Sequence, residues 1–327
     1  MSKTYGVTGI GNAIVDILAQ TTDDFIASQA QYGMQRGSMA LIDEQRAKDL
    51  YKLMTNTTEM SGGSAGNTLA AYASFGGKGA FVGKIANDHF GEVFARDTKD
   101  IGVYFDTPPL LDGPASAQCL ILVTPDAQRT MNTFLGASVK LTEADINEDL
   151  IANSEITYLE GYLFDDPQAK AAFVKAAELV KKHNGKLALT LSDSFCVVRH
   201  RDDFKRLVDN HVDILFANEE EIRELTQIGD TDQAHKSIAE NCSISIVTLG
   251  KSGSSIISGS DHIKVQSIAP TQLVDTTGAG DSYAAGFLYG LTEKKLLAEC
   301  GRLGSLAASE VISHMGPRPI TPLKSLL

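Results

Sequence analysis

The residues best suited to do chemistry form one short stretch, Asp275-Thr-Thr-Gly-Ala-Gly-Asp281, which leads directly into an apolar helical segment. Here Gly278, Ala279 and Gly280 let the backbone curl so that successive N–H groups converge, and the positive end of the following helix dipole adds to them. Such a turn stabilises a developing negative charge. Asp281 places a carboxylate beside this anion hole, where it can take a proton from an attacking hydroxyl. The combination predicts phosphoryl transfer to an alcohol.

The same stretch also has a purely structural interpretation, because Asp is a preferred N-cap residue and glycine turns precede many helices. Two familiar nucleotide loops are excluded. The chain contains no Gly-x-x-x-x-Gly-Lys-Ser/Thr sequence, and the third glycine position of a dinucleotide fingerprint is occupied by Tyr283. The absent fingerprint argues against a dehydrogenase of the doubly wound type.

A second glycine cluster, Ser61-Gly-Gly-Ser-Ala-Gly-Asn67, offers an unhindered backbone and one amide side chain. Such a surface can hydrogen-bond the hydroxyls of a sugar. The same residues can also be a turn that caps the helix after them. On these residues alone both interpretations remain open.

Short apolar runs and amphipathic stretches alternate along the chain. The runs predict buried strands, the stretches predict helices, and their alternation predicts an α/β fold with a mostly parallel sheet sandwiched by helices. The strands are expected within 5–10, 80–83, 150–158, 185–191, 212–217 and 243–249, and the helices at 64–75, 167–183 and 219–226.

One region departs from this alternation. Residues 117–124 and 130–135 are both β-prone and are joined by the turn-rich connection 125–129, which predicts a hairpin. With the extended segments 14–19 and 38–42, this hairpin predicts a small sheet that acts as a lid. We therefore expect one domain, 1–327, whose lid is built from inserted segments at about 14–42 and 114–137.

Charge and composition exclude several classes of protein. Twenty-nine Lys and Arg residues against 41 Asp and Glu give a formal net charge of −12, which disfavours binding to nucleic acid or to an anionic membrane surface. Apolar runs such as 119–123 are far shorter than the ~20 residues that cross a bilayer. The four cysteines, Cys119, Cys196, Cys242 and Cys300, form no zinc or disulfide pattern. Since no signal-peptide pattern opens the sequence, we expect a cytoplasmic protein.

Three motifs follow one another in a fixed order. The cluster Ser61–Asn67 continues into Gly76-Gly-Lys-Gly-Ala-Phe-Val-Gly-Lys-Ile-Ala-Asn-Asp-His-Phe-Gly91, and Asn218-Glu-Glu-Glu221 precedes Asp275–Asp281. Over nearly the whole chain this order resembles the ribokinase-like (PfkB) sugar and nucleoside kinases. Within that family, Gly9-Ile-Gly-Asn-Ala-Ile-Val-Asp-Ile17 is similar to adenosine kinases. The resemblance implies a ribokinase-like three-layer sandwich with a small β-sheet lid.

The resemblance also implies a role for each motif. Asp281 would be the general base, and Gly278, Ala279 and Gly280 would form the anion hole for the phosphoryl group of ATP. Asn218 and Glu221 would hold Mg²⁺ through water, although the same residues can simply start a helix. The ATP site would include Thr248, Gly250 and Gly253, with the adenine closed in by 306–314. Asp275 and Thr277 match positions at which the family often binds a monovalent cation, which predicts potassium dependence.

For the acceptor, the resemblance places Asn12 and Asp16 beside a ribose. Gly62, Gly63 and Asn67 would complete the sugar site. The residues that match the base pocket of adenosine kinases are apolar, and each of them could equally belong to the core. They are Met131, Leu135, Leu163 and Phe195.

The expected activity is therefore transfer of the γ-phosphate of ATP to the primary 5′-hydroxyl of adenosine. Another nucleoside or a free sugar, such as ribose, fructose or a keto-deoxy sugar acid, is the alternative acceptor. Two residues favour a sugar. Glu160 resembles the residue found in sugar-only kinases, and Leu163 stands where eukaryotic-type adenosine kinases have an aromatic that stacks on adenine. The apolar pocket and the lack of an arginine beyond Arg129 favour adenosine.

Two further alternatives concern catalysis and assembly. A protein that kept the fold but lost catalysis would be a sensor of a nucleoside or nucleotide. The hairpin at 117–135 offers an edge strand that needs covering, so the protein is expected to be a monomer or a homodimer paired through its lid.

Overall fold

The main sheet of the computed structural model, which describes residues 3–126 and 128–327, contains nine strands. Their order is β14-β13-β12-β11-β10-β9-β1-β5-β6. Neighbours from β12 to β6 pair in parallel, whereas β12, β13 and β14 form an antiparallel end. The strands are β1 (Tyr5–Ile10), β5 (Gly79–Val82), β6 (Tyr104–Phe105), β9 (Ser154–Glu160), β10 (Lys186–Thr190), β11 (Ile214–Asn218), β12 (Ile244–Thr248), β13 (Ser254–Ser258) and β14 (Asp261–Val265).

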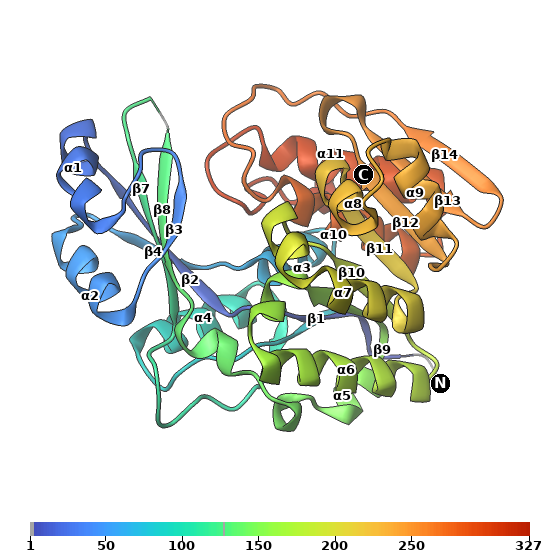
Figure 1. The fold of residues 1–327 in the computed structure, drawn as a ribbon, viewed down its shortest axis with the longest axis horizontal. Helices are drawn as coiled ribbons and strands as arrows, with labels where there is room; N and C mark the ends of the chain where they lie inside the picture. Colours follow the sequence, from blue (N-terminus) through green and yellow to red (C-terminus); the bar gives the residue numbers. More distant parts are fainter. Residues whose placement is uncertain (1–2, 127) are drawn as a thin grey trace.

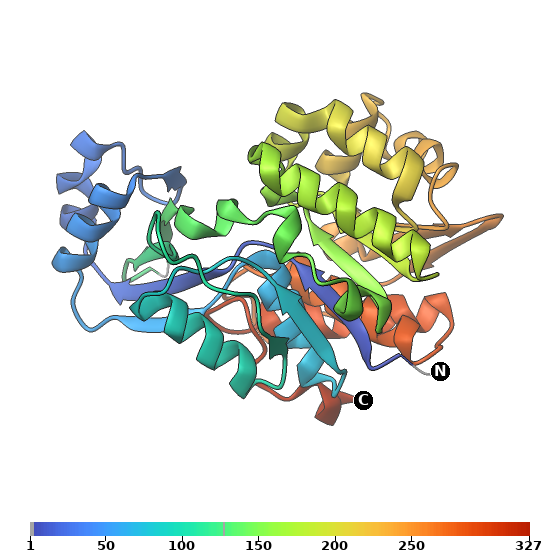
Figure 2. The ribbon, with the colours of Figure 1, turned by 90° about the horizontal axis from the view of Figure 1, so that it is seen from below.

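Helices cover both faces of this sheet, which makes the predicted three layers (Figure 2). One face carries α3 (Ser64–Ser74), α4 (His89–Asp100), α10 (Ala279–Thr292) and α11 (Leu297–Val311). The other carries α5 (Glu148–Ala152), α6 (Pro167–Lys182), α7 (Ser194–His211), α8 (Glu219–Thr226) and α9 (Thr231–Ala239). The predicted α/β fold with a mostly parallel sheet is confirmed. Among the helices of the described residues, none combines the length and apolar character that a membrane span requires.

A second sheet projects from one side of the first (Figure 1). It has five strands in the order β3-β8-β7-β2-β4, namely β3 (Met39–Leu41), β8 (Arg129–Phe134), β7 (Ala117–Val123), β2 (Ile14–Gln20) and β4 (Thr58–Ser61). The smaller sheet and its hairpin are as predicted. Sequence analysis missed β4, and it missed the helices α1 (Asp23–Ser28) and α2 (Glu44–Leu53) that pack on the sheet through Ile26, Ala47 and Leu50. That this sheet closes as a lid stays a prediction.

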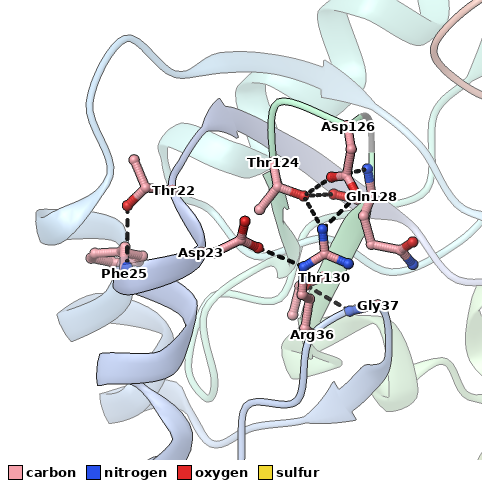
Figure 3. Close-up of polar contacts among 9 residues, drawn as sticks. All are labelled: Thr22, Asp23, Phe25, Arg36, Gly37, Thr124, Asp126, Gln128 and Thr130. Atoms are coloured by element: carbon pink, nitrogen blue, oxygen red, sulfur yellow. Dashed lines mark hydrogen bonds and ion pairs between the residues drawn. The ribbon is translucent and has the colours of Figure 1, made fainter.

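The tip of the small sheet is tied together by Arg36 (Figure 3). Its Nε donates to Asp23 Oδ1 and its Nη2 donates to Asp126 Oδ2, both at 2.6 Å. All three side chains are exposed, so water screens both ion pairs. The backbone N–H of Gly37 also donates to Thr130 Oγ1 at 3.0 Å, so the loop before β3 is fastened to the hairpin. Within the predicted connection, Ala127 lies outside the described residues.

The chain passes between the two sheets twice over very short distances. Gly11-Asn12-Ala13 separates β1 from β2, and Gly62-Gly63 separates β4 from α3. Because β1 belongs to the main sheet and β2 and β4 to the small one, these passages lie at the junction of the sheets. The predicted sugar-site residues Asn12, Gly62 and Gly63 therefore lie at that junction.

Candidate active site

The turn before α10 has the geometry of an anion hole. Gly278 is the N-cap of α10 with φ +77°, and a Cβ there would lie 2.5 Å from the carbonyl oxygen of Pro317, so only glycine fits. The backbone N–H groups of Gly280 and Asp281 donate none of the described hydrogen bonds. Two free donors at the positive end of a 14-residue helix suit a phosphoryl group.

Asp275 holds this turn in shape. Its Oδ1 accepts hydrogen bonds from the backbone N–H of Thr277 at 3.0 Å and from Thr277 Oγ1 at 2.7 Å. Its Oδ2 accepts from the N–H of Gly316 at 3.1 Å and forms an ion pair with Arg129 Nη1 at 2.9 Å. The side chains of Asp275 and Thr277 are thus occupied with each other, which leaves backbone groups for the monovalent cation expected there.

Asp281 lies in the first turn of α10 and faces α3. Ser64 Oγ donates to Asp281 Oδ1 at 2.6 Å, and Asn67 Nδ2 donates to Asp281 Oδ2 at 3.3 Å. Burial raises the pKa of Asp281 to about 6, against the effect of these two donors. The carboxylate is therefore mostly ionised at pH 7 and is a base close to its most effective range.

Asp16 lies on β2 at the same junction and is only 8% exposed. A Cβ at Gly62 would lie 2.4 Å from Asp16 Oδ2, so the glycine leaves room for the carboxylate. None of the described hydrogen bonds uses the carboxylate oxygens of Asp16. Burial raises the pKa of Asp16 to about 6, while Arg318 and Arg129 favour its ionised form. An ionised acceptor held in this way suits hydroxyl groups, and its contact with a ribose stays a prediction.

Asn12 is held by Glu160, a buried acid at the end of β9. Glu160 Oε1 accepts from Asn12 Nδ2 at 2.8 Å and from the Asn12 N–H at 3.3 Å, and Glu160 Oε2 accepts from the Ala65 N–H at 2.8 Å. Asn12 Oδ1 is buried and has no hydrogen-bond partner. This atom is a side-chain acceptor that remains for a ligand. Opposite, Gly63 has φ +82° and approaches the Asn12 carbonyl oxygen so closely that a Cβ would lie 2.3 Å from it.

We expect Glu160→Gln to destabilise the fold. Glu160 faces only donors, so the Nε2 group of glutamine would oppose either the Ala65 N–H or the Asn12 donors, leaving a buried donor unpaired. The expected loss is about 1–3 kcal/mol in the free energy of unfolding, measured by denaturant titration. Glu178→Gln, an exposed substitution on α6, is the matched control. A loss below about 0.5 kcal/mol would show that Glu160 does not anchor the junction.

The four apolar residues matched to a base pocket do not gather in one place. Met131 lies on the small sheet beside Ile14, Leu18 and Cys119, and Leu135 is half-buried just beyond β8. Leu163 is fully buried in the core cluster under α6 and α7. Phe195 is 75% exposed at the start of α7. The structure therefore places Met131 on the small sheet and Leu135 just beyond it, whereas Leu163 is a core residue.

Asn218 and Glu221 form a capping box at the start of α8. Asn218 Oδ1 accepts from the N–H groups of Glu220 and Glu221, both at 2.9 Å, and Glu221 accepts from the Asn218 N–H at 2.9 Å and from Asn218 Nδ2 at 2.7 Å. Burial raises the pKa of Glu221 to about 7. The structural interpretation of the motif is correct. The side-chain oxygens of Asn218 and Glu221, and the poorly compensated charge of the buried Glu221, also fit Mg²⁺ held through water. The described residues include no group of three or more His, Cys, Asp or Glu that could hold a metal directly.

The predicted nucleotide loop follows β12. Thr248 ends that strand, and its Oγ1 donates to the Ala217 carbonyl at 3.4 Å. Gly250 and Gly253 both have positive φ, at +55° and +93°, and a Cβ at Gly253 would lie 1.9 Å from the Val265 carbonyl oxygen. The loop therefore requires Gly253, whereas a Cβ added at Gly250 would meet nothing within 4 Å. Its contact with ATP stays a prediction.

Sequence analysis missed one charged residue of the site. Arg318, from the segment that follows α11, donates from Nε to Asn67 Oδ1 at 3.0 Å and from Nη1 to Ser61 Oγ at 2.7 Å. The expectation that the acceptor region holds no arginine beyond Arg129 is therefore wrong. It failed because Gly316-Pro-Arg-Pro follows the last long helix and matches no binding motif, so only the fold brings Arg318 to α3.

Comparisons with known proteins give a consistent picture. The family model described as pfkB family carbohydrate kinase matches residues 37–324. The crystal structure of adenosine kinase from Sinorhizobium meliloti is 46% identical, with a TM-score of 0.89 over 98% of both chains. A probable sugar kinase protein from Rhizobium etli CFN 42 is 43% identical, with a TM-score of 0.90 over 99% of this chain and 98% of the other. The curated 5-dehydro-2-deoxygluconokinase of Geobacillus kaustophilus is 26% identical, and the match covers 82% of this chain and 84% of the relative.

Proposed function

Since the chain belongs to the pfkB family of carbohydrate kinases, we propose that it transfers the γ-phosphoryl group of ATP to the 5′-hydroxyl of adenosine, giving AMP and ADP. The observation that carries the proposal is the position of Asp281. Its carboxylate lies in the first turn of α10, beside two free backbone donors, and is oriented by Ser64 and Asn67 from α3. Adenosine is favoured over other acceptors by the similarity to the Sinorhizobium meliloti adenosine kinase.

In this mechanism Asp281 accepts the proton of the 5′-hydroxyl as the oxygen attacks the γ-phosphorus. The turn Gly278–Gly280 would form the anion hole through the N–H groups of Gly278, Gly280 and Asp281, which would stabilise the charge that develops on the transferred group. The Ala279 N–H donates to the Thr276 carbonyl oxygen at 3.2 Å and would have to leave it to take part. Asn218 and Glu221 would hold Mg²⁺ through water, and the ion would neutralise charge on the phosphates of ATP. Thr248, Gly250 and Gly253 would contact the nucleotide. A potassium ion at the backbone of Asp275 and Thr277 is part of the same proposal.

The acceptor site proposed for the ribose lies at the junction of the sheets. Asp16 would accept from the ribose hydroxyls, Asn12 Oδ1 and Asn67 would add polar contacts, and Gly62 and Gly63 would leave space for the sugar. Met131 and Leu135 would contact the base, and Phe195 would reach it only if α7 and the small sheet approach each other. The small sheet would close over the bound acceptor and exclude water from the reaction.

A second candidate acceptor is a free sugar or another nucleoside. The similarity to the Rhizobium etli sugar kinase and to the Geobacillus kaustophilus 5-dehydro-2-deoxygluconokinase favours it. Arg318 is a cation at the acceptor site, which suits the carboxylate of a keto-deoxy sugar acid and removes one argument against such a substrate. Ribose and fructose stay alternatives of the same chemistry.

The proposal is tested with 5′-deoxyadenosine, which lacks only the attacking oxygen. We expect it to compete with adenosine and to receive no phosphate, while adenosine yields AMP identified by its ³¹P signal. Phosphorylation of 5′-deoxyadenosine would refute transfer to the 5′ position. Raised thermal stability with adenosine but no ADP release would instead favour the nucleoside or nucleotide sensor.

We expect Asp16→Asn to weaken acceptor binding more than it slows the chemical step. The carboxylate has no described protein partner for its oxygens, so its charge is available to ribose hydroxyls. A hydrogen bond to a charged group contributes about 1.5–3 kcal/mol, so KM for adenosine should rise about 10- to 100-fold with kcat changed far less. Steady-state kinetics measure both constants. Asp49→Asn, on the exposed side of α2, is the control, and an unchanged KM in D16N would remove Asp16 from the acceptor site.

The assembly state belongs to the proposal as well. The expectation that the hairpin at 117–135 offers an edge strand is wrong, because β7 and β8 lie inside the small sheet between β3 and β2. The edges are β3 and β4, and Met39 and Leu41 on β3 are exposed. An exposed apolar edge strand is a place where a second copy can pair. The protein is therefore a monomer or a homodimer paired through the small sheet, and light scattering coupled to size-exclusion chromatography distinguishes the two.

A further inference from the structure

Arg318 lies against the acceptor site although it follows the last long helix of the chain. Its Nε donates to Asn67 Oδ1 at 3.0 Å and its Nη1 donates to Ser61 Oγ at 2.7 Å. A Cβ at Gly66 would lie 3.5 Å from its Nη2, so the guanidinium rests on the first turns of α3. The same face of α3 supplies the two donors to Asp281.

We propose that Arg318 is a positioning residue, which orients the Asn67 amide toward the Asp281 carboxylate and supplies the positive charge that offsets Asp281 and Asp16. The inference rests on the proposed function, in which Asp281 is the base. It adds a residue from the end of the chain to a site otherwise built from the two glycine motifs and the first strands.

The orientation of the Asn67 amide follows from its two contacts. An asparagine amide has one acceptor oxygen and one donor nitrogen, so fixing one end determines what the other end presents. Because Arg318 Nε has only a proton to offer, it must face Oδ1, and Nδ2 then points at Asp281. Without Arg318, the amide is held at Asp281 only by the 3.3 Å contact from Nδ2. The amide is then less firmly oriented, and so is the Asp281 carboxylate that it holds toward the acceptor hydroxyl.

The charges around Asp281 make a nearby cation important. The negative charge of Asp281 raises the pKa values of four groups around it. They are Asp16 on β2, Glu160 and Tyr158 on β9, and Tyr162 on η4 (Gly161–Asp165). Among the described residues, Arg318 is the cation whose charge favours the ionised form of Asp281. Burial lowers the pKa of Arg318 to about 10, so it stays charged at neutral pH. Its loss would raise the pKa values of Asp281 and Asp16 together.

The test compares Arg318→Met, Arg318→Lys and Arg302→Met. Arg302 is a half-exposed residue of α11 paired with Glu299, so its loss removes a charge of the same kind away from the site. In R318M we expect kcat/KM for adenosine to fall about 10- to 100-fold. In a plot of kcat against pH, the acidic limb should move about one pH unit higher. R318K keeps the charge but not the Nε donor, so its limb should stay at the wild-type position while kcat remains reduced. R302M should match the wild type.

An acidic limb of R318M at the wild-type pH, with kcat/KM within about threefold of wild type, would overturn the inference. A lower kcat in R318M with an unmoved limb would reduce Arg318 to a structural role and also overturn it. If the wild type phosphorylates no acceptor, the proposed function fails, and the inference is then judged by ¹³C NMR titration of the Asp281 carboxyl, assigned with D281N. A higher pKa in R318M supports it and an equal pKa refutes it. Should R318M not fold, R318Q is titrated in its place.

Discussion

Asp281→Asn is expected to lower kcat about 10³-fold while adenosine and ATP still bind. The asparagine keeps the size of the side chain but has no lone pair basic enough to take the proton of the acceptor hydroxyl. General-base catalysis contributes about 10²–10⁴-fold, and the site offers no second carboxylate at the start of α10 to replace it. Single-turnover kinetics measure the chemical step directly, and calorimetry measures the binding of adenosine.

The pH dependence of the wild type provides an independent check on this role. Because burial raises the pKa of Asp281 to about 6, activity should be lost as pH falls through about 6, when the carboxylate becomes protonated. Asp261→Asn, an exposed substitution on β14, controls for the change of one charge. A D281N enzyme with kcat within tenfold of the wild type would show that another group removes the proton.

Gly278→Ala is the change with the second-largest expected effect. Gly278 has φ +77°, and an added Cβ would lie 2.5 Å from the Pro317 carbonyl oxygen and 2.8 Å from Pro317 Cα, so the turn must shift. A shift moves the N–H groups of Gly280 and Asp281 away from the transferred phosphoryl group. The loss of one such donor costs about 10²–10³-fold in kcat, and we expect a loss in that range with KM for adenosine nearly unchanged.

The matched control is Gly259→Ala, in the turn between β13 and β14. Gly259 also has positive φ, at +55°, but nothing lies within 4 Å of an added Cβ. Both variants carry the conformational cost of alanine at positive φ, about 1 kcal/mol, and only G278A disturbs the turn before α10. Equal kcat values in the two variants would contradict the anion hole.

The parts of the fold that the sequence predicts are those fixed by local patterns. Several of the parallel strands are short apolar runs next to an amphipathic stretch, so β10 and α6 could be located within one or two residues. Asn218 and Glu221 are three positions apart, which is why their capping box was foreseeable as the alternative to a metal role. β4 was missed because Thr58-Glu-Met-Ser61 has no strand pattern of its own and forms by pairing with β2.

The parts of the site that escaped prediction depend on long-range contacts. Glu160 joins Asn12 and Ala65 across 148 and 95 positions, and Arg318 joins Asn67 across 251 positions. No local sequence pattern indicates such partners, because in the sequence a buried acid or arginine cannot be distinguished from a charged residue on the surface. Phe195 shows the opposite error, since an apolar side chain assigned to a pocket lies on the surface.

The most direct test of the central claim is ADP release from ATP and Mg²⁺ against a panel of adenosine, other nucleosides, ribose, fructose and keto-deoxy sugar acids. We predict that kcat/KM is highest for adenosine and that its product is AMP. Highest turnover with a free sugar or a sugar acid would keep the chemistry at Asp281 but contradict adenosine as the acceptor. If none of the acceptors on the panel gives ADP release, the proposed function as a whole is contradicted.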